Sequence, residues 1–345
     1  MCGIIGYVGH QQAAPILLDG LARMEYRGYD SAGVAVRSET KGLQVYKSKG
    51  RLQVLSDMIH GGADVEGTLG IGHTRWATHG EPNDINAHPH VSEDGRIAMV
   101  HNGIIENYME IKQQLLRHGV TFKSETDTEV AAQLLEFHYN ECHNMLEAVG
   151  RVLRRIEGSY AFGIICADYP NALIAARKDS PMIIGVSDGE SYLASDVPAI
   201  LKYTRTVYYL GNLELARLTP QGISFFNLDG DEISKEPVEI LWNAEAAEKG
   251  GYEHFMMKEI HEQPKAVEDT LRSVCTDGSI DLEKTGLTRD AVASFRQVWV
   301  IGCGSAYHVG VAAQYVLEDL AQLPVRVDLA SEFRYRSMPL DPNGL

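Results

Sequence analysis

The chain has 345 residues and a formal net charge of −16, and this length predicts about two domains. The acidic balance argues against nucleic-acid binding and against general attraction to an anionic membrane, because both require clustered lysine and arginine. Five cysteines without a CxxC spacing argue against a disulfide framework or a zinc site. No signal peptide and no run of about 18 apolar residues occurs, so we expect a cytoplasmic protein.

Short apolar runs bounded by glycine, aspartate or asparagine predict the strands, and apolar residues at helical spacing predict the helices. In chain order we expect a strand at 3–8, a helix at 12–24, strands at 33–36, 43–47, 69–75 and 97–102, and helices at 104–118 and over 127–156. Further strands are expected at 159–167, 172–177, 182–186, 191–195, 206–210 and 222–227. Strand clusters on both sides of a helical block indicate helices packed on sheets rather than a simple alternating parallel fold.

The composition becomes charged and turn-prone around residues 228–257, and we place the domain boundary there. The expected division is a first domain at 2–240, an interdomain linker and helix at 241–285, and a second domain at 286–345. Within the second domain we expect a strand–helix–strand unit, the start of a parallel α/β domain, at 298–302, 306–321 and 325–330. It stops far short of a complete sheet, so we expect this domain to be truncated at Leu345.

Cys2 is a candidate nucleophile, because removal of Met1 would leave a thiol and a free α-amine on one residue. The ordinary pKa of such an amine is about 7.7–8.0, so near pH 7 part of it is a neutral base that can take the thiol proton. The alternative is a small buried cysteine near the terminus. The GIIG sequence that follows begins a strand at once, which would hold the terminus in a sheet and favours the nucleophile.

Three further segments carry polar residues suited to a substrate. GHTRWATHG (72–80) holds Arg75, which can pair with a carboxylate, or else forms a structural ion pair in a surface loop. In VHNGIIENY (100–108), Asn102 and Gly103 are expected where a strand turns toward a helix. An Asn amide and a Gly N–H can donate to an oxyanion, whereas Asn-Gly alone commonly marks only a turn.

SETDTE (124–129) predicts the start of a helix near Asp127, with Ser124 or Thr126 as its cap. Asp127 can also bind an ammonium group, although capping is the simpler interpretation of this segment. In the turn-rich EYRGYDSAG (25–33), Arg27 and Asp30 can brace the nucleophile strand.

Taken together, Cys2-Gly-Ile, EYRGYDSAG, GHTRWATHGEP, NAHPH, VHNGIIEN and SETDTE resemble, in this order, the class II glutamine amidotransferase domain of the Ntn-hydrolase fold. The resemblance is closest to the isomerising glutamine–fructose-6-phosphate aminotransferases. It continues through YEHFMMKEIHEQPKAV (252–267) into SEFRYR (331–336). It implies an α+β fold, in which a four-layer αββα sandwich is followed by the beginning of an α/β SIS (sugar isomerase) domain.

The resemblance also implies a role for each residue of a glutaminase site. Cys2 would attack the glutamine amide with its own α-amine as base, and Asn102 and the Gly103 N–H would hold the oxyanion. The roles of the remaining site residues concern the substrate and the released ammonia: Arg75 would bind the α-carboxylate, Asp127 the α-ammonium group, Thr78 and His79 would line the pocket, and Trp76 would gate an ammonia channel.

For the sugar half of the reaction, the resemblance implies fructose 6-phosphate as acceptor, glucosamine 6-phosphate as product, no metal or organic cofactor, and a homodimer when full length. CGSAYH (303–308) matches a sugar-phosphate loop of the form CGTSY through Cys303, Gly304 and Ser305, but Ala306 lacks the hydroxyl of the Ser. The alternative for this segment alone is a tight turn. The remaining sugar-site residues would lie beyond Leu345, so we expect at most glutamine hydrolysis.

Two other functions are compatible with parts of the sequence. Another class II amidotransferase, of the phosphoribosylamine-forming or asparagine-forming type, would need a phosphoribosyl- or ATP-binding second domain, which CGSAYH and SEFRYR do not fit. A non-catalytic sugar-phosphate sensor would use an SIS domain only to bind its ligand. Cys2 beside a removable Met1 argues against a sensor, which needs no terminal nucleophile.

Overall fold

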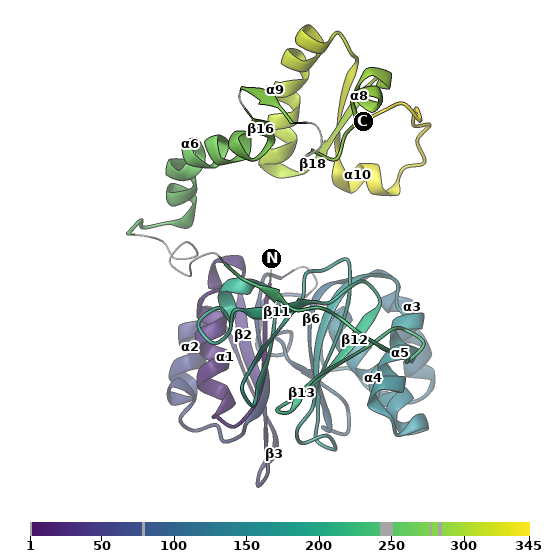
Figure 1. The fold of residues 1–345 in the computed structure, drawn as a ribbon. Helices are drawn as coiled ribbons and strands as arrows, with labels where there is room; N and C mark the ends of the chain where they lie inside the picture. Colours follow the sequence, from purple (N-terminus) through teal and green to yellow (C-terminus); the bar gives the residue numbers. More distant parts are fainter. Residues whose placement is uncertain (1, 78–79, 242–250, 277, 282–284) are drawn as a thin grey trace. The chain divides into compact units, whose positions relative to one another are not determined.

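The computed structural model of the protein describes residues 2–77, 80–241, 251–276, 278–281 and 285–345. The chain divides into two compact units, Met1–Glu248 and Lys249–Leu345. The first unit contains two large sheets with helices on their outer sides, and the second contains helices and short strands (Figure 1).

The first sheet is antiparallel throughout and holds eight of the described strands, in the order β15-β11-β9-β10-β1-β4-β2-β3. In chain order their bounds are β1 Gly3–Val8, β2 Ser31–Ser38, β3 Gly42–Lys49, β4 Leu69–Arg75, β9 Ile183–Ser187, β10 Glu190–Ala194, β11 Thr206–Tyr209 and β15 Val238–Glu239. Strand β1 is central, because β4 pairs with one of its edges and β10 with the other.

The second sheet is also antiparallel and holds seven described strands, in the order β14-β13-β12-β8-β7-β6-β5. Their bounds are β5 His90–Val91, β6 Ile97–Ile105, β7 Gly158–Cys166, β8 Leu173–Lys178, β12 Glu214–Thr219, β13 Gly222–Phe226 and β14 Glu232–Ile233. The long β6–β7 pair runs without interruption from Ile97 to Ile105, and it forms one wall of the site described below.

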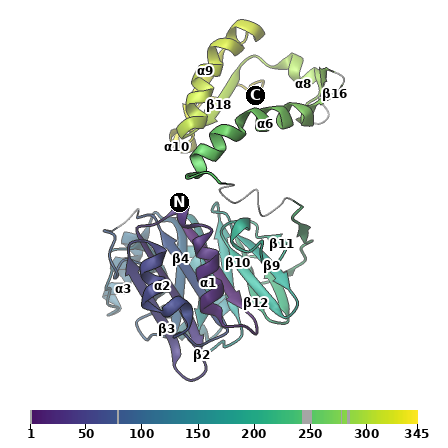
Figure 2. The same ribbon diagram turned by 90° about the vertical axis from the view of Figure 1, so that its left-hand side faces the viewer.

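The two sheets pack face to face between helices, which makes the four αββα layers that the resemblance implies (Figures 1 and 2). The helices are α1 Ala13–Ala22 and α2 Leu52–Met58 on the first sheet, and α3 Tyr108–Arg117, α4 Asp127–Cys142 and α5 Met145–Arg155 on the second. Three separate apolar cores fill the three interfaces between these layers.

Strand β1 shows why the sequence specifies this arrangement. Alternate side chains of a strand point to opposite faces of its sheet. Ile5 and Tyr7 enter the core under α1, whereas Ile4 and Val8 enter the core between the sheets. Both faces are buried, so the strand is a continuous apolar run, and each buried Ile contributes about 1.5–3 kcal/mol of transfer free energy.

Most expected elements are present with ends shifted by a few residues, but one boundary was wrong. The expected helix at 104–118 begins only at Tyr108, because Ile104 and Ile105 remain in β6 and pair with Ser159 and Gly158. The short helix α2 and strand β12 were not predicted. In β12 the charged Glu214 and Arg217 interrupt the apolar residues, so the sequence pattern did not indicate this six-residue strand.

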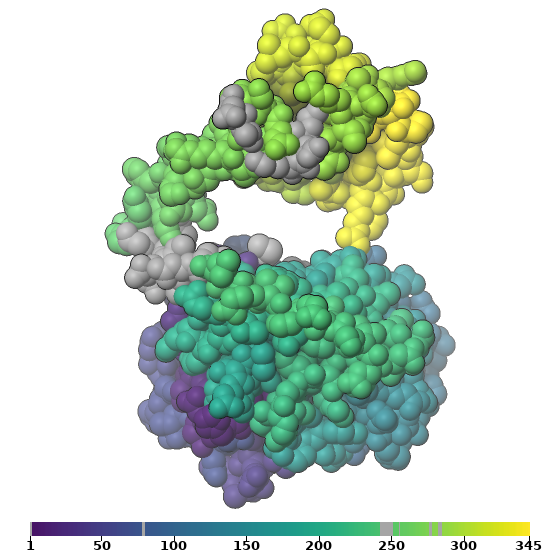
Figure 3. Space-filling view, viewed as in Figure 1, coloured from purple at the N-terminus to yellow at the C-terminus, as the bar shows by residue number. Residues whose placement is uncertain are grey.

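The second unit confirms the expected strand–helix–strand arrangement. Its elements are α6 Phe255–Val274, β16 Cys275–Thr276, β17 Ser279–Ile280, α8 Arg289–Ser294, β18 Val298–Gly302, α9 Gly304–Ala321, β19 Val325–Leu329 and α10 Ala330–Tyr335. Strands β18 and β19 are parallel and are joined through α9. Helix α6, green in Figure 3, is exposed along most of its length. Among the described residues, no helix combines the length and apolar character needed to cross a membrane.

Candidate active site

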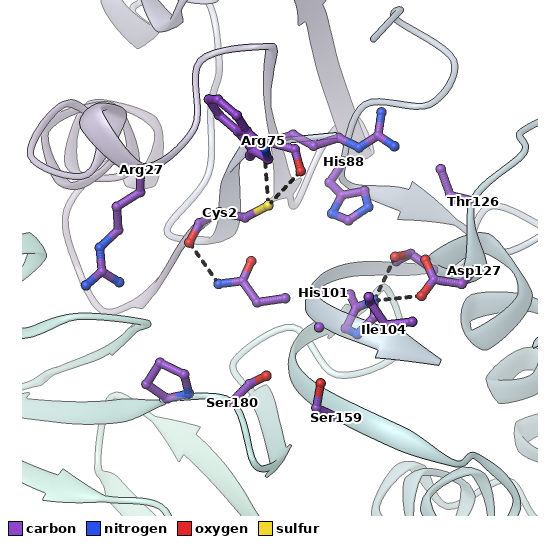
Figure 4. A pocket seen from close by; sticks show the side chains of 15 residues that line it. Cys2, Arg27, Arg75, His88, His101, Ile104, Thr126, Asp127, Ser159 and Ser180 are labelled. Carbon is purple, nitrogen blue, oxygen red and sulfur yellow. Dashed lines mark hydrogen bonds and ion pairs between the residues drawn. The ribbon is translucent and has the colours of Figure 1, made fainter. Parts of the chain in front are cut away.

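A cavity of about 350 Å³ lies in the first unit where strands of both sheets and the start of α4 meet (Figure 4). Six of the predicted glutaminase residues line it, and they come from four separate chain segments: Cys2, Arg75, Trp76, Asn102, Gly103 and Asp127. Thr78 and His79, which were also predicted, lie outside the described residues. The cavity therefore joins motifs that are up to 125 residues apart in the sequence.

Cys2 directly precedes β1, and its sulfur is held by the end of β4. The Sγ atom accepts a hydrogen bond from the Trp76 N–H at 3.2 Å and lies 3.5 Å from the Trp76 carbonyl oxygen, to which the thiol can donate. Burial raises the pKa of the Cys2 thiol, and the Trp76 N–H and the Arg75 charge only partly oppose this. Because the thiol is protonated near pH 7, it needs a base before it can act as a nucleophile.

Asn102 and Gly103 lie beside Cys2, but in a strand and not in the predicted turn. The Asn102 Nδ2 donates to the Cys2 carbonyl oxygen at 3.1 Å. Gly103 has φ +129°, and a Cβ at this position would lie 2.0 Å from the Ser159 carbonyl oxygen. Only glycine fits so close to β7, so here the Asn-Gly pair marks a close approach between two strands.

Arg75 and Asp127 bring opposite charges to this cavity, and both side chains are almost fully buried. Arg75 is the last residue of β4, and its Nη2 donates to the Gly80 carbonyl oxygen at 3.4 Å. Asp127 is the first residue of α4, and its Oδ2 accepts the Ile105 N–H of β6 at 2.9 Å. A buried cation and a buried carboxylate in one cavity suit a ligand that carries both an anionic and a cationic group.

The predicted cap of α4 is confirmed and is provided by Thr126. Its Oγ1 accepts the Glu129 N–H at 3.2 Å, while the Glu129 carboxylate accepts the backbone N–H groups of Lys123 and Ser124. The Glu129 carboxylate thus holds the segment before the N-cap residue, while the Thr126 N–H itself donates to Ser124 Oγ at 3.3 Å. Because Thr126 satisfies the helix start, the Asp127 side chain is free to face β6 and the cavity, where Figure 4 shows it across from Cys2.

Four buried histidines lie at this site: two of them line the cavity, two more lie against these, and the sequence analysis singled out none of the four. They are His73, His88, His90 and His101, each at most 6% exposed. Burial lowers the pKa of His73 to about 3 and holds those of His88 and His90 well below their usual value. These three rings are therefore neutral at pH 7. Each of these histidines lies within or beside a motif quoted in the sequence analysis, and this position in the sequence was the signal that could have pointed to them.

The segment expected to brace the nucleophile strand contacts its surroundings in two places. Arg27, which lines the cavity, forms an ion pair with Asp196 at 2.5 Å, just beyond β10. Asp30 accepts the Ala77 N–H at 2.8 Å and so holds the residue after Trp76. Trp76 is 45% exposed and meets the Tyr29 ring edge-on at 5.4 Å. The turn-rich segment thus supports the chain around Trp76.

In the second unit, the predicted sugar-phosphate residues lie at the start of α9. Cys303 occupies the N-cap position, and Gly304 and Ser305 form the first turn, so the helix begins two residues earlier than predicted. All three are exposed. In the part of the chain that the structure describes, no group of three or more His, Cys, Asp or Glu side chains is arranged to hold a metal ion.

Comparisons with known proteins identify a glutamine amidotransferase domain followed by an SIS domain. The model of the glutamine amidotransferase domain matches residues 73–202, and that of the SIS domain matches residues 292–344. The isomerizing glutamine–fructose-6-phosphate aminotransferase of Caldanaerobacter subterraneus subsp. tengcongensis is 53% identical over 338 residues, which cover 98% of this chain and 55% of that protein. The corresponding protein of Clostridium acetobutylicum is 49% identical over 346 residues, and the aligned region covers 100% of this chain and 56% of that protein.

The chain thus spans about half the length of the curated relatives it matches. Among solved structures, glutamine phosphoribosylpyrophosphate amidotransferase from B. subtilis aligns with a TM-score of 0.58 and 20% identity, over 94% of this chain and 65% of that one. At this identity the likeness shows the fold alone, which is the Ntn-hydrolase amidotransferase sandwich. The chain thus matches the glutamine amidotransferase and SIS domains in this order, and over 98% to 100% of its own length it is similar to isomerising glutamine–fructose-6-phosphate aminotransferases.

Proposed function

We propose that the first unit hydrolyses glutamine, with Cys2 as nucleophile, and that the ammonia serves to convert fructose 6-phosphate to glucosamine 6-phosphate in a complete family member. One observation carries the proposal: the Cys2 sulfur shares a cavity with the buried side chains of Arg75 and Asp127. Glutamine carries an α-carboxylate for the arginine and an α-ammonium group for the aspartate, so its side-chain amide can extend toward the sulfur.

In the proposed reaction the base is the α-amine of Cys2 after removal of Met1. This amine takes the thiol proton as Sγ attacks the amide carbon, and the Asn102 Nδ2 and Gly103 N–H stabilise the resulting oxyanion. The C–N bond then breaks, the proton passes to the leaving nitrogen, and ammonia departs. Water hydrolyses the γ-glutamyl thioester to glutamate and restores the thiol. The raised pKa of the thiol supports the need for this base.

The remaining predicted residues complete the substrate site in this proposal. Thr78 and His79, which follow β4 in the sequence, line this site, and Trp76 controls the passage of ammonia. The backbone N–H of Trp76 contacts the Cys2 sulfur, and its exposed ring supports this role, because a half-exposed ring can move without disturbing a core.

The acceptor site is proposed for the second unit, in a full-length, cytoplasmic homodimer. Cys303, Gly304 and Ser305 lie at the N-terminus of α9, where backbone N–H groups and the helix dipole favour a phosphate. Exposed apolar side chains on α9, such as Tyr315 at 72% and Leu320 at 77%, support further protein contacts for this unit. With Ala306 in place of a hydroxyl residue and about half the family's length present, we expect no sugar amination by this chain alone.

The test is to incubate the purified chain with glutamine and fructose 6-phosphate and to measure glutamate, ammonia and glucosamine 6-phosphate. We expect glutamate and ammonia without the amino sugar. Cys2→Ala should abolish glutamate formation, whereas Cys142→Ala, a half-buried cysteine outside the cavity, should not. Glutamate formation by Cys2→Ala would refute the nucleophile, and accumulation of glucosamine 6-phosphate would refute the restriction to hydrolysis.

Two measurements separate this proposal from its rivals. The glutamine-like electrophile 6-diazo-5-oxo-norleucine should modify Cys2 alone, and intact-mass analysis should show that Met1 has been removed. Absence of any modification would favour a non-catalytic sugar-phosphate sensor. A retained Met1 in an active preparation would exclude the α-amine as the base.

A further inference from the structure

A buried histidine touches Asn102 from the side opposite Cys2. His73 lies in β4 and has no exposed surface. Its Nε2 lies 3.0 Å from the Asn102 Oδ1 and 3.1 Å from the His101 carbonyl oxygen. Its other ring nitrogen, Nδ1, is buried and forms no hydrogen bond with any described residue. The two oxygen acceptors that contact this ring therefore both lie at Nε2.

These contacts determine where the single proton of the neutral ring lies. Both oxygens are carbonyl oxygens, which only accept hydrogen bonds, so the Nε2 that faces them must carry the hydrogen. The opposite tautomer would direct the Nε2 lone pair at two oxygens and bury an unpaired N–H at Nδ1. The Nδ1 of His88, 3.2 Å from the same Nε2, must then be an acceptor as well.

The orientation of the Asn102 amide follows from its two contacts. Its Oδ1 accepts from His73, and its Nδ2 donates to the Cys2 carbonyl oxygen at 3.1 Å. Rotating the amide by 180° would place oxygen against oxygen at Cys2 and N–H against N–H at His73. Each contact therefore disfavours the reversed amide, and His73 provides the one that does not depend on the nucleophile itself.

We propose that His73 is a positioning residue for glutamine hydrolysis, which fixes the Asn102 amide so that its N–H groups face the oxyanion. This inference rests on the oxyanion role of Asn102 in the proposed function. His73 touches neither substrate nor nucleophile in this role and acts only through Asn102. Burial keeps the ring neutral, and the single N–H of the neutral ring is sufficient for its contact with Asn102.

The matched variants are His73→Leu and His73→Gln. Leucine fills the space but cannot donate, whereas the glutamine Nε2 can donate from near the position of the imidazole Nε2. Loss of a single oxyanion donor costs about 10²–10³ in turnover. We expect His73→Leu to lower kcat by about 10–10² with an unchanged KM, since the hydrogen bond from Asn102 to the oxyanion forms only in the transition state. His73→Gln should recover most of that loss.

A double-mutant cycle separates positioning from a purely structural role. If His73 acts through Asn102, His73→Leu should have no further effect on kcat in an Asn102→Ala background. An equal loss of kcat in both backgrounds, or a rise in KM alone, would overturn the proposal for His73. An Asn102→Ala variant with unchanged kcat would instead refute the oxyanion role in the proposed function, so the two failures are distinguishable.

The tautomer itself can be measured even if His73→Leu does not fold. Long-range ¹⁵N–¹H correlation spectra of ¹⁵N-histidine-labelled protein at pH 7 identify the protonated nitrogen of each ring, with the His73→Gln spectrum assigning the His73 signals. A neutral ring protonated at Nε2 is the expected result. Protonation at Nδ1, or at both nitrogens, would overturn the assignment.

Discussion

Replacing Gly103 with alanine tests whether the close approach of β6 and β7 forms the active cavity. The added Cβ would lie 2.0 Å from the Ser159 carbonyl oxygen, although real Cβ atoms essentially never come within 3.0 Å of such an atom. The two strands must then shift by about 1 Å. The backbone φ of +129° is a second, independent source of strain for any residue with a side chain.

Gly222→Ala is the matched control, because it isolates the backbone strain. Gly222 has φ +145°, and a Cβ there would meet no atom within 4 Å. Strain of this kind costs about 1–3 kcal/mol, which lowers Tm by roughly 2–12 °C for a unit of this size. Gly103→Ala carries the same strain and an overpacking cost of about 1–3 kcal/mol besides. A shift of about 1 Å beside the nucleophile should also lower kcat by about 10².

Calorimetry of the first unit and initial rates of glutamate release measure the two effects. We expect Gly222→Ala to be less stable but nearly as active as the unaltered chain, and Gly103→Ala to be both less stable and much less active. Equal losses of Tm with full activity in both variants would show that β7 can move away from the added Cβ at no cost, and would refute the predicted clash.

Three further predictions concern charge, capping and pH. Asp127→Asn should raise the KM for glutamine by about 10–10², because a charge-assisted hydrogen bond is worth about 1.5–3 kcal/mol. The control Asp57→Asn changes an exposed residue of α2 and should leave KM unchanged. Equal KM values for both variants would exclude Asp127 as the ammonium site. Thr126→Ala should lower the free energy of unfolding by about 0.5–2 kcal/mol in urea titrations, and Thr126→Ser should restore it, since the serine hydroxyl can still accept the Glu129 N–H. Burial holds the pKa of His73 at about 3 and lowers those of His88 and His90, so the unfolded chain binds more protons below pH 6.5. The free energy of unfolding should therefore fall as the pH drops below about 6.5, by up to about 1.4 kcal/mol per pH unit for each histidine. His90→Gln should make this pH dependence less steep, and an unchanged slope would contradict the assignment of a neutral His90.

Much of the fold was predictable, because the sandwich buries both faces of its central strands. Strand β1 and strand β7 are continuous apolar runs for this reason, and they were placed correctly within a residue or two. The error at residues 104–105 came from apolar residues that suit a helix and a strand equally. Their pairing with Ser159 and Gly158, more than 50 residues away, decided the outcome.

The candidate site was predictable as a set of motifs, but its geometry was not. Cys2, Arg75, Asn102 and Asp127 were each identified from local chemistry and from the resemblance, and the fold brings them to one cavity. His73 gave no separate signal, because a single histidine in an apolar strand resembles any core residue. Its contact with Asn102 depends on the stacking of two sheets, which no local pattern encodes. The roles of Thr78 and His79 stay predictions.

The central position of β1 has a consequence for biosynthesis. The strand next to Cys2, the proposed nucleophile, is synthesised long before its partner β10, which is complete only at Ala194, so the two-sided pairing of β1 must await most of the domain. During translation neither the Trp76 backbone nor the Asn102 amide would yet lie beside Cys2, and the thiol would therefore remain unreactive. Late assembly of this kind would keep the proposed nucleophile inactive until most of the domain has been synthesised.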